Sequence, residues 1–203
     1  MNPRLIAICL AATLALPVLH GCFPLIAGGV VVGALVADDR RTLGAQTEDK
    51  AIFTKAESRV NERFGNRVHV NVTPFNRRVL LTGEVPDAAT RTEVERVVGG
   101  IENVAGIVNE LQIGGISSLT ARTSDSIITG KVKGNFVDDR DIHANALKVV
   151  TEASVVYLMG LVTRAEGDRA AQVAARTSGV RQVIKVLEYI AQVPQVHASD
   201  AKK

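Results

Sequence analysis

The stretch VLLTGEV, Val79–Val85, decides the fold, because the chain contains a second copy of it. The second copy is VYLMGLV, Val156–Val162, and both place a glycine at the fifth position, Gly83 and Gly160. Similar segments flank the two copies in the same order along the chain. Two copies are too few for a solenoid, so we interpret each as the centre of a small domain.

Apolar residues before the first glycine strand recur first at helical and then at strand spacing. A spacing of three or four residues predicts a helix, and strict alternation predicts a half-buried strand. The helix-spaced residues are Phe53, Ala56, Val60 and Phe64, and the alternating ones are Val68, Val70 and Val72.

A helical pattern follows each glycine strand, over 87–100 and 164–179, and a strand pattern over 104–113 and 180–190 ends each copy. In the second copy, Thr163 and Glu166 have capping-box spacing, and Gly100 and Gly179 are C-terminal stop signals. We therefore expect an α+β fold of two domains, each α-β-β-α-β. Both helices should cover one face of a small mixed three-stranded sheet.

The N-terminus predicts a lipoprotein signal peptide. Met1–Arg4 is short and cationic, and Leu5–Leu19 is almost wholly apolar but too short to span a bilayer. The following LHGCFP resembles a lipobox, in which Cys22 is acylated and becomes the first residue of the mature chain. The other cysteine, Cys9, lies within the signal, so the mature protein has no thiol for a disulfide.

The residues after the acylated cysteine predict which membrane the lipoprotein is attached to. Gram-negative lipoproteins kept at the inner membrane carry Asp at this position, and Phe23 lacks that signal. The resemblance therefore implies the periplasmic face of the outer membrane. Pro24–Ala37 is glycine-rich and too short to span, so it is interpreted as a tether, with a second membrane-insertion element as the alternative.

The predicted organisation has six segments. They are a signal peptide at 1–21, the lipidated cysteine and tether at 22–46, a first domain at 47–113, a linker at 114–123, a second domain at 124–191 and a disordered tail at 192–203.

Composition and motifs exclude several classes of function. The formal charge is only +3, and no run of like charges offers an arm for nucleic acid. The chain has no nucleophile elbow and no Walker loop, so we expect neither an enzyme nor a small-molecule substrate or cofactor. No histidine pair has metal-ligand spacing, which predicts no metal site, and His69 is expected to face solvent from its strand.

The order of elements, the V-x-L-x-G-x-V strand and the closing strand together resemble the BON domain. Two such copies behind a lipobox are similar to the dual-BON outer-membrane lipoproteins. The stretches that carry the likeness are Asp38–Asp49, Ser124–Val132, Val155–Glu166 and Ala174–Ile190. The resemblance implies a palmitate-bearing lipoprotein that binds anionic phospholipid through its second domain and supports envelope integrity and cell division.

The first helix of the second domain is the candidate lipid-binding element. It is expected over Ser126–Val137, with Ile128, Val132 and Phe136 as its sheet-facing stripe. Ile127 lies among glycines and lysines on the other side, a composition suited to a membrane surface. The predicted lipid-binding residues are Ile127, Ile128, Gly130, Lys131, Lys133, Gly134 and Val137.

Two alternatives stay open at this point. Ile127 could pack against the first domain or the linker instead of meeting lipid, and relatives tend to carry an aromatic residue there. The protein could also be a lipid-anchored adaptor that contacts envelope proteins or peptidoglycan without recognising phospholipid.

Overall fold

The computed structural model describes residues 39–191 of the 203-residue chain, and all of them belong to one compact unit. The predicted signal peptide, Cys22, most of the tether and the tail lie outside the described residues. The rest forms two successive sets of helices and strands, which we call the first and second domains.

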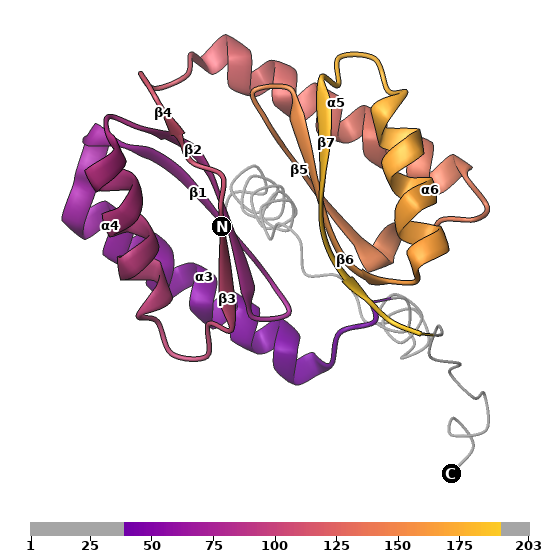
Figure 1. Ribbon diagram of the computed structural model, residues 1–203, viewed down its shortest axis with the longest axis horizontal. Helices are drawn as coiled ribbons and strands as arrows, with labels where there is room; N and C mark the ends of the chain where they lie inside the picture. Colours follow the sequence, from indigo (N-terminus) through magenta and orange to yellow (C-terminus); the bar gives the residue numbers. More distant parts are fainter. Residues whose placement is uncertain (1–38, 192–203) are drawn as a thin grey trace, which may run out of the picture. The chain divides into compact units, whose positions relative to one another are not determined.

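The first domain contains a mixed sheet with two helices on the same side of it (Figure 1). Strand β2 pairs antiparallel with β1 and parallel with both β3 and β4. The predicted strand over 104–113 is thus split, because Leu111 leaves the pairing and places its side chain in the core. The elements are α3 Leu43–Phe64, η1 Gly65–Arg67, β1 His69–Phe75, β2 Arg78–Val85, α4 Ala88–Gly99, β3 Gly106–Asn109 and β4 Gln112–Ile113.

The second domain repeats this arrangement with an unbroken last strand. Strand β6 pairs antiparallel with β5 and parallel with β7, and both helices again lie on one side of the sheet (Figure 1). The elements are α5 Leu119–Asp138, η2 Ala144–Ala146, β5 Leu147–Glu152, β6 Val155–Val162, α6 Arg164–Ala175 and β7 Gln182–Tyr189. The predicted α+β class and the α-β-β-α-β order are confirmed in both domains.

The repeated glycines stand where two strands approach too closely for a side chain. A Cβ atom on Gly83 would lie 2.0 Å from the carbonyl oxygen of His69, and one on Gly160 would lie 2.6 Å from that of Ala146. Both distances are far below van der Waals contact. The glycine in each copy therefore permits its hairpin to form.

A buried aspartate in the first helix of each domain holds the hairpin turn. Asp49 and Asp125 each accept two backbone N–H bonds from the turn, with nitrogen–oxygen distances of 2.7–2.9 Å. The turn residues have positive φ, which side chains other than glycine adopt at a cost, and these bonds offset it. The four donors are Asn76, Arg77, Ala153 and Ser154.

Each domain has an apolar core between its helices and its sheet. In the first domain the helix contributes Ile52, not the predicted Phe53, which is 40% exposed. The buried positions of α3 repeat every four residues from Ile52 through Ala56 and Val60, so Phe53 lies about 100° off that row.

The second face of each sheet is covered by the other sheet. Phe75 and Leu80 of the first domain form one buried cluster with Tyr157, Met159 and Val186 of the second. Because the strand alternates, these residues point away from the helices of their own domain. Burial raises the pKa of Tyr157 to about 12, as expected for a phenol enclosed in this contact.

Two predicted helix boundaries are wrong. Helix α5 begins at Leu119, inside the predicted linker, because Ser118 caps it by accepting a bond from the Ala121 N–H at 3.2 Å. Helix α6 ends at Ala175, whereas Gly179 stands in the following turn with φ of +97°.

We expect Gly160→Ala to lower the free energy of unfolding by about 1–3 kcal/mol, because its Cβ would collide with backbone. Urea unfolding of a 39–191 fragment measures this. The control is Gly134→Ala, since Gly134 faces open space in a helix and its substitution should be neutral or stabilise by about 1 kcal/mol. Equal effects at both positions would contradict the role given to Gly160.

Candidate functional site

Helix α5 is fixed on its sheet by three side chains spaced four residues apart. Ile128, Val132 and Phe136 are 6%, 0% and 1% exposed and belong to the core of the second domain. These are the predicted sheet-facing residues. Their burial orients the opposite side of the helix toward solvent along its whole length.

The opposite side of α5 is exposed and mainly apolar or small. Leu119, Ile127 and Val137 are 77%, 55% and 73% exposed. At about 100° per residue they lie in one sector with two exposed glycines. We call this sector the outer face of α5, and its residues are Leu119, Thr120, Thr123, Ile127, Gly130, Lys131, Gly134, Val137 and Asp138.

The outer face of α5 carries exposed lysines and one exposed acid at its C-terminal end. Lys131 and Lys133 are exposed, Asp125 is buried against its turn, and Asp138, the last residue of α5, is exposed. The equivalent helix α3 has exposed charges of both signs, at Lys50, Lys55, Glu57, Arg59, Glu62 and Arg63. The two copies therefore share a framework and differ in their outer surface.

Six of the seven predicted lipid-binding residues are exposed, namely Ile127, Gly130, Lys131, Lys133, Gly134 and Val137. The prediction that Ile128 binds lipid is wrong, because this side chain packs in the core and cannot reach a membrane from its helix position. The alternative that Ile127 packs against the first domain or the linker is wrong, since over half of its side chain is exposed.

Sequence reasoning missed the apolar residues that precede Ile127. Leu119 is on the outer face of α5 because the helix starts earlier than predicted. Ile113 and Ile116 are also exposed, at 56% and 46%, but they precede the helix and are not part of its outer face. Ser118 is a favourable N-cap residue, and this signal in the sequence could have placed the start of the helix at Leu119.

The segment before α3 is held on the second domain by a buried ion pair. Arg40 lies 2.6 and 3.1 Å from the two carboxylate oxygens of Glu166 and donates to the Leu161 carbonyl at 2.8 Å. Their side chains are only 7% and 5% exposed. This pair fixes the point where the chain from the predicted tether meets the folded protein.

Glu166 is surrounded by donors. Burial alone would raise its pKa, but hydrogen bonds from Arg40 and from the His143 backbone N–H lower the pKa of Glu166 overall. Its backbone N–H donates to the Thr163 hydroxyl at 3.3 Å, which is one half of the predicted capping box. The carboxylate does not complete the box, because it binds Arg40 instead.

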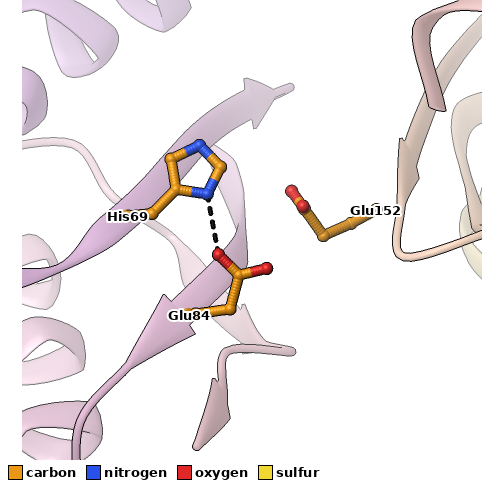
Figure 2. A group of neighbouring side chains, drawn as sticks. All are labelled: His69, Glu84 and Glu152. Atoms are coloured by element: carbon orange, nitrogen blue, oxygen red, sulfur yellow. Dashed lines mark hydrogen bonds and ion pairs between the residues drawn. The ribbon is translucent and has the colours of Figure 1, made fainter. Parts of the chain in front are cut away.

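A second polar cluster lies between the domains. His69 Nδ1 is 2.9 Å from Glu84 Oε2, and Glu152 of the second domain faces both (Figure 2). The prediction that His69 faces solvent is wrong: alternation placed it correctly on the side away from the helices, but the second domain covers that side. Burial raises the pKa of Glu152, although Asn71 donates to it.

None of the helices between residues 39 and 191 combines the length and the apolar character needed to cross a bilayer.

The sequence matches the BON domain twice, over residues 54–115 and 124–191. It is 35% identical over 187 residues to the outer membrane lipoprotein DolP of Haemophilus influenzae, covering 91% of this chain and 95% of that protein. It is 30% identical to a 21 kDa hemolysin of Actinobacillus pleuropneumoniae, over 75% of this chain and 79% of that one. It is 26% identical to the osmotically-inducible protein Y of Escherichia coli, over 74% of this chain and 77% of that one.

We expect Arg40→Met to lower the free energy of unfolding by about 3 kcal/mol at pH 7, because it leaves the Glu166 carboxylate buried without its cation. The folded pKa of Glu166 is lowered, so the stability it contributes exists above its unfolded pKa of about 4.3 and is lost as pH falls through the folded value. The difference between the variant and the wild type should therefore shrink near pH 3.

Urea unfolding at both pH values measures this difference. The control is Arg169→Met, which breaks the pair with Asp139 where the arginine is 42% exposed, and it should cost less than about 1 kcal/mol. A cost for Arg40→Met that does not change with pH would rule out the ion pair as its cause.

Proposed function

The chain belongs to the BON-domain family, and from this premise we propose that it is an outer-membrane lipoprotein that binds anionic phospholipid through the outer face of α5. The observation that carries the proposal is an exposed, mainly apolar helix surface with exposed lysines, on which Asp138 at the C-terminal end is the one exposed acid of α5.

Membrane attachment is proposed to come from Cys22. The sequence around it has the lipobox pattern, and the relative with 35% identity is named an outer membrane lipoprotein. A fully extended chain from Cys22 to Arg40 spans at most about 60 Å. The acyl chains would therefore keep the folded domains close to the periplasmic surface of the membrane.

The strength of each contact suggests a division of labour. Transfer of an isoleucine side chain from water gives about 1.5–3 kcal/mol, and a lysine near an anionic surface gives about 1 kcal/mol. Each acyl CH₂ adds about 0.8 kcal/mol. The acyl chains would hold the protein on the membrane, and the outer face of α5 would select anionic lipids.

Helix chemistry supports contact with lipid at this place. Gly130 and Gly134 have open space in front of them, so the backbone of α5 can approach a flat surface closely. Ile127 and Val137 then project from it as apolar side chains that have no polar tip. Relatives with an aromatic residue in place of Ile127 should prefer the headgroup depth more strongly.

We propose that this lipid contact supports envelope integrity and division-site function, as the family likeness implies. The alternative of an adaptor for envelope proteins or peptidoglycan would use the same exposed residues. Such an adaptor could not bind a partner through an open sheet face, because the two sheets cover each other.

We expect Ile127→Ser to weaken binding of the 39–191 fragment to phosphatidylglycerol-containing liposomes by about tenfold, through lost apolar transfer. Co-sedimentation measures it. The matched control is Ile113→Ser, because Ile113 is 56% exposed and Ile127 is 55% exposed, but Ile113 lies on β4. Equal losses in both variants, or a fragment that binds no liposome while capturing an envelope protein, would favour the adaptor.

We expect Lys131→Glu to reduce binding to anionic liposomes by more than tenfold, because it replaces an attractive charge of about 1 kcal/mol with a repulsive one. Raising the salt concentration should weaken the wild type in the same assay, and neutral phosphatidylcholine liposomes should not distinguish the two proteins. Lys50→Glu on α3 is the control. A loss as large in Lys50→Glu would mean that net charge, not the outer face of α5, sets the affinity.

A further inference from the structure

Three potential metal ligands meet where the two domains contact each other. His69 and Glu84 are paired residues of β1 and β2, so their side chains leave the first sheet on the same face. Glu152, at the end of β5, points toward them from the second domain (Figure 2). One ligand atom from each residue lies within 4.8 Å of the other two.

We propose that His69, Glu84 and Glu152 form a zinc site that links the first domain to the second. This goes beyond the proposed function, because it concerns how the domains are joined and not how the membrane is contacted. One imidazole nitrogen and two carboxylate oxygens are a donor set that zinc accepts, with water completing a tetrahedron.

The carboxylates are already oriented by donors of their own. Asn71 donates to Glu152 Oε2 at 2.8 Å, and the Ser117 backbone N–H donates to Glu84 Oε2 at 3.2 Å. Within residues 39–191, Oε1 of Glu84 and Oε1 of Glu152 accept no hydrogen bond, so each residue keeps one oxygen for a cation. Such second partners are a regular feature of zinc sites.

A route to the site exists. His69 and Glu152 line a cavity of about 330 Å³, which also includes Arg122, Asp125 and Thr129. Zinc and its water can therefore reach His69 and Glu152 without opening either core, and Glu84 lies 2.9 Å from His69. Arg122 does not take the place of the cation, because its guanidinium donates to the backbone and side chain of Ser117.

The charges favour a cation. Glu84 and Glu152 are 8% and 4% exposed, and in this buried setting their carboxylates and the His69 imidazole face one another. A divalent ion would offset the repulsion between two carboxylates at low dielectric. Zinc bonds of about 2.0–2.2 Å require ligand atoms about 3.3 Å apart, and side-chain rotation can bring atoms that already lie within 4.8 Å of one another to that spacing. The bound ion would then link β1 and β2 of the first domain to β5 of the second.

A second histidine–glutamate pair in the chain differs, because an arginine already neutralises its carboxylate. His143 Nδ1 is 3.0 Å from Glu166 Oε1, but Arg40 binds the same carboxylate and occupies the position that a cation would need. His143 therefore belongs to an arginine-neutralised pair and offers a matched control within the same chain.

The test uses the full chain in detergent, stripped with chelator and titrated with zinc chloride by isothermal calorimetry. We expect one zinc per chain and a higher unfolding midpoint when zinc is present. His69→Ala and Glu152→Gln should each weaken binding at least tenfold and abolish the zinc-dependent shift, whereas His143→Ala should bind as the wild type does.

Glu152→Gln keeps the size of the side chain and its bond from Asn71, and its metal-free unfolding midpoint checks that the variant folds. Magnesium should not replace zinc, because the imidazole is a poor ligand for it. The proposal is overturned if the wild type takes up no stoichiometric zinc, or if uptake is unchanged in His69→Ala and Glu152→Gln, as it would be for a site in the terminal segments.

Discussion

The apolar contact between the two sheets governs what the rest of the protein can do. Each sheet has its helices on one face, and the other face meets the partner sheet through Phe75 and Leu80 on one side and Tyr157 and Met159 on the other, all at most 4% exposed. Neither sheet then offers an open face to a ligand. Recognition by residues 39–191 must use helix surfaces, strand edges or the margin of the contact, and both proposals made above lie in those places.

The two domains show how a duplicated framework acquires one specialised surface. Gly83 and Gly160 permit the hairpins, and Asp49 and Asp125 hold the turns, at equivalent places. Few residue types fit these positions, because each one avoids a backbone collision or supplies a hydrogen bond inside its own domain. The outward surfaces of α3 and α5 are under no such constraint. The surface of α3 carries many charges of both signs, and that of α5 carries mainly glycine, isoleucine, valine and lysine, with one exposed acid at Asp138.

Sequence reasoning succeeded for the framework that the two domains share. The repeated strand, the order of elements and the exposed side of Ile127 follow from periodicity. It failed at helix ends, where capping decides, and at residues whose burial depends on packing. Alternation placed His69 opposite the core of its own domain but could not tell that the second domain covers it. Periodicity also gave the wrong residue in α3, because Ile52 and Phe53 both fit an apolar pattern and only packing chooses between them. Cys22 and most of the predicted tether lie outside residues 39–191, and the lipid anchor stays a prediction.

The central claim is that the outer face of α5 enters the headgroup region of an anionic membrane while the sheets stay packed together. The described residues contain no cysteine, so a spin label at position 127 of a 39–191 fragment would be attached at a single thiol. Its collision rates with oxygen and with a water-soluble nickel complex report its depth in phosphatidylglycerol vesicles. The account predicts that oxygen access rises and nickel access falls at position 127, with no change at position 113. Unchanged nickel access at position 127 in the presence of vesicles would contradict it.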